Sequence, residues 1–245
     1  MAITKETLNK LRQFDTPTIC NVIELFGVRP RTVGFMNESI RSAFPELPPM
    51  VGYASTAAFR SSAPAAKGDA YGSMERQVEL FADLPGPAVV VFQDLDDPAV
   101  GATFGEVMCS VYRAFGSTGL ITSGGGRDLL QVKALDYPVF TDSTICSHAD
   151  CHILHIGLPV HVGGLVVNNG DLLHGDANGV TNIPPNIAAA VADITPDFIA
   201  AEKIILDYVN GSGLKTPAGL TAARKEFSAV VAKLTERAKA SVSKA

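Results

Sequence analysis

The sequence predicts an α/β protein whose C-terminal end is helical. Short apolar strands alternate with helical segments between residues 51 and 141, which is typical of a sheet covered by helices. Residues 153–183 instead form short apolar runs separated by Gly, Pro and Asn-Gly turns, and helical patterns follow to residue 240. The chain has 245 residues, of which 47% are hydrophobic, so it can bury a core without disulfides or a metal.

The first half of the chain is expected to begin with two helices. Residues 4–27 have helical spacing, and Asp15-Thr16-Pro17 should divide them, because Asp or Thr caps a helix and Pro fits its first turn. A loop with short strands follows over residues 30–50. Strands are then expected at 51–59, 88–92, 120–122 and 139–141, and helices at 68–82, 104–115 and 129–134.

The second half is expected to form short strands and then two helices. The strands lie at 153–156, 160–162, 165–167 and 172–174, with a further turn and strand at 176–183. A helix should begin at Pro184 and run to about Asn210, and a last amphipathic helix is expected at 220–240. We therefore expect a main domain over residues 1–210 and a linker with an amphipathic helix over residues 211–245.

Charge and composition argue against several classes of protein. The formal net charge is -5 and no long basic run occurs, so we expect no nucleic-acid partner. The N-terminus lacks the apolar region of a signal peptide, and no apolar stretch is long enough to suggest a membrane span. The four cysteines form no Cys-x-x-Cys motif. We expect a cytoplasmic protein with reduced thiols and no membrane association.

The segment with the clearest chemical character is Gly124-Gly125-Gly126-Arg127-Asp128, which follows an expected strand. Glycines let backbone N–H groups approach an anion, and Arg127 offers a planar fork of donors to a carboxylate or phosphate. Asp128 can hold a hard divalent cation through oxygen. The pattern favours a site for a small anionic substrate and Mg²⁺.

A structural role for Asp128 is the alternative. Asp128 and Gln131 have the spacing of a capping box, so Asp128 could simply cap the next helix.

A second candidate segment is Gly105-Glu106-Val107-Met108, at a transition from loop to helix. Glu106 could lie near the cation, while the backbone N–H groups of Val107 and Met108 face the substrate. Alternatively, Glu106 only complements the helix dipole.

These motifs resemble the RraA-like family. The resemblance covers roughly residues 15–205 and rests on Gly105-Glu106, Arg127-Asp128 and the later segments YPVF, PVHVGG, VNNGDLLHGDANGV and IP. The family includes class II 4-hydroxy-4-methyl-2-oxoglutarate aldolases, which also decarboxylate oxaloacetate, and noncatalytic regulators of ribonuclease E. The resemblance implies a layered β/β/α catalytic domain, to which the C-terminal helical segment is an addition.

The resemblance also implies roles for individual residues. Arg127 would bind the keto acid and Asp128 would hold Mg²⁺ or Mn²⁺. Glu106 stands where the aldolases usually have Asp, and Gly105, Val107 and Met108 would contact the substrate. A glutamate from a neighbouring subunit would complete the metal site, in a homotrimer or homohexamer. Glu202, on the helix after the IP segment, is the candidate by spacing.

The predicted function is a divalent-metal-dependent carbon–carbon lyase acting on 2-oxo dicarboxylic acids. It would cleave substrates like 4-hydroxy-4-methyl-2-oxoglutarate to pyruvate by a retro-aldol reaction, and it would decarboxylate oxaloacetate. The cation and Arg127 would stabilise the pyruvate enolate, while Glu106 and Glu202 could order a water that acts as base. The alternatives are a noncatalytic regulator of a ribonuclease, whose relatives tend to lack the subunit-crossing glutamate, and a lyase or hydratase acting on another hydroxy acid.

Three further segments have open interpretations. Residues 146–155 contain two Cys and three His, which could bind zinc or could form a histidine-rich loop at the rim of the site. The acidic run Gln93–Asp97 could support the site but better fits a solvated loop at the end of a strand. Asp171 and Asp176 are expected in turns, and Cys109 in the core.

Overall fold

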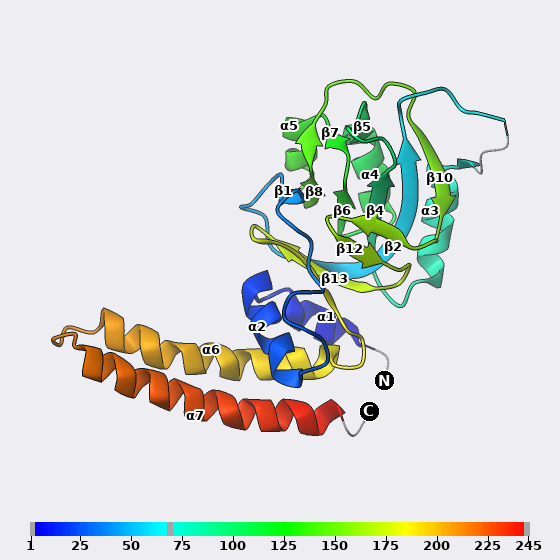
Figure 1. The fold of residues 1–245 in the computed structure, drawn as a ribbon. Coiled ribbons are helices and arrows are strands. Elements are labelled where there is room, and N and C mark those ends of the chain that lie inside the picture. The colour runs from blue at the N-terminus through cyan, green and yellow to red at the C-terminus, as the bar shows by residue number, and fades with distance from the viewer. Residues whose placement is uncertain (1–2, 68–70, 243–245) are drawn as a thin grey trace.

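The computed structural model describes residues 3–67 and 71–242, and its centre is a mixed β-sheet (Figure 1). Four parallel strands form the middle of this sheet: β2 (Met50–Arg60), β4 (Ala88–Asp94), β6 (Gly119–Thr122) and β8 (Val139–Thr141). The short strand β1 (Arg41–Ser42) pairs antiparallel with β8 and closes that edge.

The long strand β2 has two antiparallel partners on its other side. β13 (Leu172–Asp176) pairs with its first residues, and β10 (His152–Ile156) pairs with its last residues. β14 (Gly179–Ile183) extends the sheet beyond β13, and β3 (Tyr71–Gly72) extends it beyond β10. β11 (Val160–Val162) and β12 (Leu165–Val167) form a separate hairpin.

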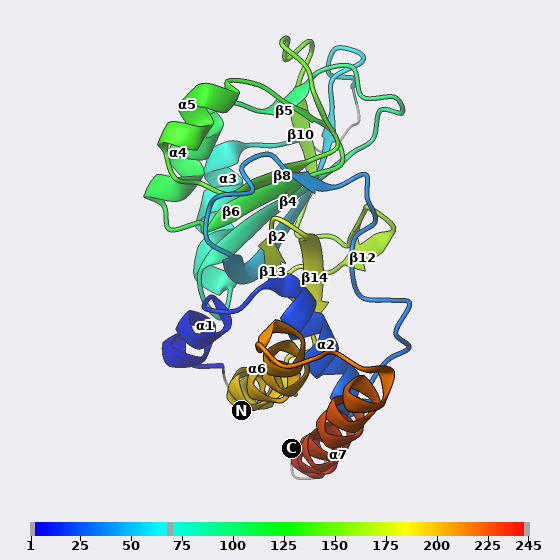
Figure 2. The ribbon, with the colours of Figure 1, turned by 90° about the vertical axis from the view of Figure 1, so that its left-hand side faces the viewer.

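The sheet is covered on both faces, as Figure 2 shows. The helices α3 (Met74–Glu79), α4 (Glu106–Ala114) and α5 (Leu129–Ala134) lie on one face, and the β11–β12 hairpin covers the other. A 3₁₀ turn, η1 (Leu80–Asp83), follows α3. Val90 and Phe92 of β4 pack into the core under the helices, whereas Val89 and Val91 pack under the hairpin. The continuous apolar run of this strand therefore reflects burial on both faces.

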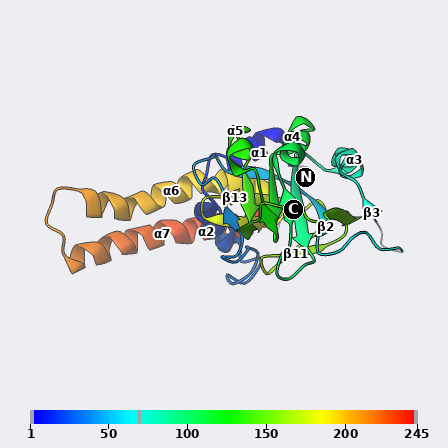
Figure 3. The ribbon, with the colours of Figure 1, turned by 90° about the horizontal axis from the view of Figure 1, so that it is seen from above.

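A helical layer covers one end of the sheet. It contains α1 (Lys5–Leu11), α2 (Thr16–Phe26), α6 (Ala188–Asn210) and α7 (Pro217–Val242), whose side chains form one apolar core with Val51, Tyr53 and Leu172. The paired helices α6 and α7 extend well beyond the sheet (Figure 3). Within residues 3–67 and 71–242, no helix is long and apolar enough to cross a membrane.

The structure confirms the mixed α/β fold with a C-terminal helical region and corrects several expected boundaries. Residues 68–70 of the expected helix at 68–82 lie outside the described residues, and β3 precedes α3, which begins only at Met74. Ser73 caps α3 by accepting a hydrogen bond from the backbone N–H of Arg76. The helix expected from Pro184 begins at Ala188 after a turn, and Phe104 belongs to a strand rather than to the helix that follows it.

Candidate functional site

A small parallel sheet, which the sequence did not predict, brings the two candidate segments together. β5 (Ala102–Phe104) pairs with β7 (Gly125–Gly126), and β7 pairs with β9 (Ser143–Thr144). β5 leads directly into Gly105 and α4, and β7 leads directly into Arg127 and Asp128. The pairing therefore places the ends of these two segments side by side.

The glycines of the triplet are required by close packing. A Cβ at Gly126 would lie 2.1 Å from the ring of Phe104, and a Cβ at Gly124 would lie 2.4 Å from Oδ2 of Asp94. Such distances are shorter than van der Waals contact, so a side chain at Gly126 would collide with β5 and one at Gly124 would collide with β4.

Asp128 caps a helix other than the one that it precedes. Its φ is 54°, in the left-handed region, and its side chain makes no capping hydrogen bond to α5. Oδ2 of Asp128 instead accepts a hydrogen bond of 3.0 Å from the backbone N–H of Glu106, the first residue of α4. The expectation of a capping box with Gln131 is therefore wrong, because the left-handed backbone turns the carboxylate toward α4.

Gly105 makes this arrangement possible. A Cβ at Gly105 would lie 2.6 Å from Oδ2 of Asp128 and 3.2 Å from Nε of Arg127. The backbone of Gly105 is extended, with a φ of -156°, so glycine is needed here for space and not for its backbone freedom.

Arg127 and Asp128 are both partly open to solvent. The side chain of Arg127 is 35% exposed and that of Asp128 is 38% exposed, and Nε of Arg127 lies 3.9 Å from Oδ2 of Asp128. A pair so exposed contributes little to stability. Both side chains therefore remain free to meet a ligand.

The candidate site is a cavity of about 220 Å³ between α3, α4 and the small sheet. Predicted site residues from both segments line it: Gly105, Val107, Met108, Arg127 and Asp128. Four residues that the prediction did not assign also line it: Met74, Ala102, Thr103 and Phe104. His148 lines it too, from the segment that could form the rim of the site. Glu106 begins α4 beside this cavity and is exposed.

The donors at this cavity fit a cation that keeps most of its waters. Asp128 supplies a hard oxygen ligand, and Mg²⁺ commonly binds through one or two carboxylates and several waters. Across the described ranges, no three His, Cys, Asp or Glu side chains are grouped closely enough to hold a metal ion. This also removes support for a zinc site in residues 146–155, where Cys146 and Cys151 are exposed free thiols.

Glu202 does not reach this cavity within its own chain. It lies on α6, at the opposite end of the molecule from α4 and α5 (Figure 1). Partial burial, with a smaller contribution from the charge of Asp15, raises the pKa of the Glu202 carboxyl.

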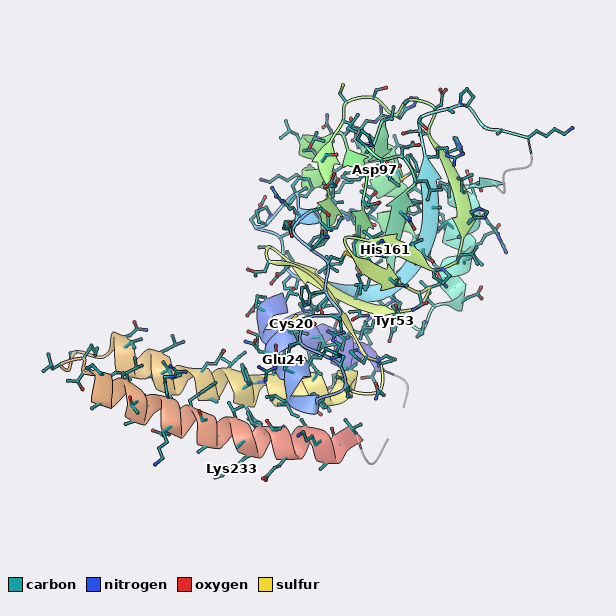
Figure 4. The ribbon with its side chains drawn as sticks, viewed as in Figure 1. Cys20, Glu24, Tyr53, Asp97, His161 and Lys233 are labelled. Atoms are coloured by element: carbon teal, nitrogen blue, oxygen red, sulfur yellow. The ribbon has the colours of Figure 1, made fainter. Side chains whose placement is uncertain are left out.

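The acidic run Gln93–Asp97, which begins within β4, is more structural than predicted. Asp96 accepts hydrogen bonds from the backbone N–H groups of Ser61 and Ser62, and Asp94 is buried. Burial raises the pKa of Asp94 to about 6. Of the three acidic residues in this run, only Asp97 is exposed as expected, and Figure 4 shows it far from α6 and α7. No local pattern in the sequence indicates that Asp94 is buried while Asp97 is exposed.

The remaining predictions concern structural residues. Asp171 closes the turn at residues 168–171 and accepts a hydrogen bond from the backbone N–H of Asn168. Asp176, the last residue of β13, opens the turn to β14 and accepts one from the backbone N–H of Asn178. Cys109 is fully buried in the core, and burial raises the pKa of its thiol well above the ordinary value. These three expectations are confirmed.

The family described as RraA-like, Aldolase/RraA, matches residues 16–181, which contain both candidate segments. The chain belongs to the RraA-like family. The matched region includes the whole central sheet apart from the last residues of β14, and the cavity with Arg127 and Asp128.

A curated relative carries the name of an enzyme. The chain is 30% identical over 135 residues to a protein of Halalkalibacterium halodurans named "Putative 4-hydroxy-4-methyl-2-oxoglutarate aldolase". The match covers 53% of this chain and 63% of that relative, so it spans less than two thirds of the relative's length.

Two solved structures have the same fold as this chain. An uncharacterized protein from Pseudomonas syringae pv. tomato superposes with a TM-score of 0.70 at 20% identity, over 92% of this chain and 95% of its own. RraAS2 of Streptomyces coelicolor, described as an unusual member of the RNase ES inhibitor RraA family, gives a TM-score of 0.66 at 20% identity. That match covers 82% of this chain and 95% of RraAS2. Identities this low establish the fold and not the activity.

Proposed function

We propose that this protein is a divalent-metal-dependent carbon–carbon lyase that acts on 2-oxo dicarboxylic acids. Its reactions would be the retro-aldol cleavage of substrates like 4-hydroxy-4-methyl-2-oxoglutarate and the decarboxylation of oxaloacetate. The observation that carries the proposal is the shared cavity of Arg127, Asp128 and the first turn of α4. The name of the Halalkalibacterium halodurans relative supports the same choice of substrate.

The first turn of α4 suits a substrate carboxylate. The backbone N–H of Glu106 donates to the carboxylate of Asp128. The first N–H that donates to a backbone carbonyl four residues earlier is that of Cys109, which bonds to Gly105. The N–H groups of Val107 and Met108 lie between these two and have no helical partner. They form the positive end of the helix dipole, where anions bind favourably.

Arg127 supplies the fixed positive charge of the site. Its guanidinium can donate two parallel hydrogen bonds to a carboxylate, which would orient the 2-oxo acid in the cavity. A bound Mg²⁺ or Mn²⁺ would supply Lewis-acid polarisation of the 2-oxo group, with Asp128 as its protein ligand. When the carbon–carbon bond breaks, its electron pair forms the enolate of pyruvate, and Arg127 stabilises the developing negative charge.

Release of pyruvate with and without a divalent cation tests the proposal. The substrates are oxaloacetate and 4-hydroxy-4-methyl-2-oxoglutarate, assayed with Mg²⁺ and again with EDTA. We expect pyruvate from both substrates, with release abolished by EDTA. If the purified protein releases no pyruvate and binds neither Mg²⁺ nor pyruvate, this result would favour a noncatalytic role.

Asp128→Asn identifies the residue responsible, and Asp136→Asn is a matched control. Both aspartates are exposed, both have a φ near 50° and they flank the same helix, α5. Asn tolerates this backbone conformation, so the two substitutions differ mainly in which charge they remove. We expect kcat/KM at limiting Mg²⁺ to fall by at least about 100-fold in Asp128→Asn, and by less than about 3-fold in Asp136→Asn. Equal activities in the two variants would show that Asp128 is not the metal ligand.

A further inference from the structure

The loop between β9 and β10 brings one histidine to the candidate site, and no part of the proposed function uses it. His148 lines the cavity that contains Arg127 and Asp128. This placement agrees with the interpretation of residues 146–155 as the rim of the site. A histidine can act on a substrate from such a loop only if the loop holds it in place.

Hydrogen bonds anchor this loop to the strands that build the site. The backbone N–H of Ile145 donates to the carbonyl of Gly126, immediately before Arg127, at 3.0 Å. The N–H of Ala102, on β5, donates to the carbonyl of Ser147 at 2.7 Å. Two residues just before His148 therefore tie the loop to the site: Ile145 to β7, which leads to Arg127, and Ser147 to β5, which leads to Gly105.

The turn at His148 is also tightly constrained. Ala149 has a φ of 46°, a strained conformation for a residue with a Cβ, and its N–H donates to Oγ of Ser147 at 3.1 Å. The N–H of Asp150 donates to the carbonyl of Ser61 at 3.1 Å. A Cβ at Gly101 would lie 2.7 Å from the carbonyl oxygen of His148, so the turn packs closely on β5. Strained conformations persist where the surroundings impose them, and they concentrate at functional sites.

The imidazole ring of His148 has a defined orientation. Nδ1 lies 2.7 Å from the carbonyl oxygen of Ala149. A carbonyl only accepts, so Nδ1 carries a proton and the neutral ring has its lone pair on Nε2. A histidine fixed in this way presents a single nitrogen that can accept a proton from a ligand.

We infer that Nε2 of His148 is the group that recognises the 4-hydroxyl of a 4-hydroxy-2-oxo acid and accepts its proton during cleavage. This inference rests on the proposed function. The proton passes from the hydroxyl to Nε2, the hydroxyl-bearing carbon becomes a carbonyl, and the bond between C3 and C4 breaks. Its electron pair forms the enolate of pyruvate, which is then protonated at C3 by the proton returned through Nε2 or by water.

The two proposed reactions differ in their need for such a base. Retro-aldol cleavage requires the removal of a hydroxyl proton, whereas decarboxylation of oxaloacetate forms the same enolate by loss of CO₂ and has no hydroxyl to deprotonate. His148 should therefore matter for the first reaction and not for the second. This difference separates a role in recognising the hydroxyl from a general role in folding or in binding the 2-oxo acid.

The test compares His148→Asn with His155→Asn in the full-length protein supplied with Mg²⁺. His155 is an exposed histidine on β10 that does not line the cavity, so it is a matched control. We expect His148→Asn to lower kcat/KM for 4-hydroxy-4-methyl-2-oxoglutarate by at least about 100-fold and for oxaloacetate by less than about 3-fold. His155→Asn should change neither by more than about 3-fold.

A binding measurement provides a second readout that does not depend on turnover. The compound 2,4-dihydroxyglutarate carries the hydroxyl but lacks the 2-oxo group needed for cleavage. We expect its dissociation constant, measured by calorimetry, to rise at least about 10-fold in His148→Asn, and that of pyruvate to stay within about 2-fold.

The outcomes distinguish this inference from the proposed function. Equal loss of both reactions in His148→Asn, or no loss of either, would overturn the role of His148 while leaving a lyase in place. A wild-type protein that releases no pyruvate from either substrate would overturn the proposed function. In that case, binding of 2,4-dihydroxyglutarate that is unchanged in His148→Asn would overturn the inference as well, and weaker binding would support recognition of the hydroxyl by His148.

Discussion

Asp128 combines two roles in one side chain, because its carboxylate caps α4 through Oδ2 and lines the candidate cavity. The same carboxylate thus fixes the helix whose first turn is proposed to bind the substrate. Its position depends on the space that Gly105 leaves. A change at Gly105 should consequently disturb the chemistry more than the fold.

Gly105→Ala tests this dependence. The new Cβ would lie 2.6 Å from Oδ2 of Asp128, so the carboxylate must move, while the extended φ of -156° suits alanine. We expect kcat/KM to fall by at least about 10-fold, with a change in the free energy of unfolding of no more than about 2 kcal/mol. Gly213→Ala is the control, because a Cβ there meets no atom within 4 Å. Activity of Gly105→Ala at the level of that control would mean that the position of Asp128 is not critical.

The strands of the central sheet could be predicted from the sequence, but the small sheet at the site could not. β4 has a continuous apolar run that is typical of a strand buried on both faces, and the structure places it at the centre of the sheet. β5, β7 and β9 have only two or three residues each, and β7 consists of two glycines. Elements this short have no periodicity, so their pairing depends on long-range contacts that a single sequence does not reveal.

The same distinction applies to the candidate site. Arg127 and Asp128 stood out because their residue types after a glycine triplet suggest ligand binding. The side-chain cap of Asp128 on α4 depends on a left-handed backbone angle, and the place of His148 depends on a turn held by Ser61 and Gly101. These features are tertiary, and no local pattern indicates them.

At the level of elements, His174 connects the helical layer to the sheet. It lies on β13 and is fully buried, with Nε2 at 3.1 Å from the carbonyl oxygen of Leu11, at the end of α1. The carbonyl accepts, so Nε2 carries the proton and Nδ1 accepts from Oγ1 of Thr16, the first residue of α2, at 2.9 Å. Burial is the largest influence on this ring and lowers the pKa of His174 below its ordinary value.

The lowered pKa of His174 predicts how stability depends on pH. The folded state keeps the ring neutral, whereas in the unfolded chain the ring takes up a proton below about pH 6.5. The unfolded state then binds more protons, so the free energy of unfolding decreases as the pH falls below about 6.5. In urea denaturation at pH 7.5 and 5.5, we expect wild type to lose more stability between these values than His174→Gln does. A loss of the same size in both proteins would show that His174 does not contribute to it.

At the level of the whole molecule, we propose that copies of this chain meet through two exposed regions. Val107 and Leu130, on α4 and α5 beside the candidate cavity, are 73% and 81% exposed. Leu206 on α6 and Leu214 at the tip of the α6–α7 pair are also exposed. Glu202 lies on the same α6, far from the cavity of its own chain, so it can reach such a cavity only in a neighbouring subunit.

Mixing two variants tests whether Glu202 acts across a subunit boundary in a trimer or hexamer. In Asp128→Asn every cavity lacks the proposed metal ligand, and in Glu202→Gln every cavity lacks the neighbour's acid, so each protein alone should be inactive. Subunit exchange between them creates some boundaries at which an intact Asp128 meets an intact Glu202, and pyruvate release should partly return. Exchange of Asp128→Asn with the double variant Asp128→Asn/Glu202→Gln is the control, because no cavity in that mixture has Asp128. If native mass spectrometry shows mixed oligomers and activity does not return, Glu202 does not complete a neighbour's site.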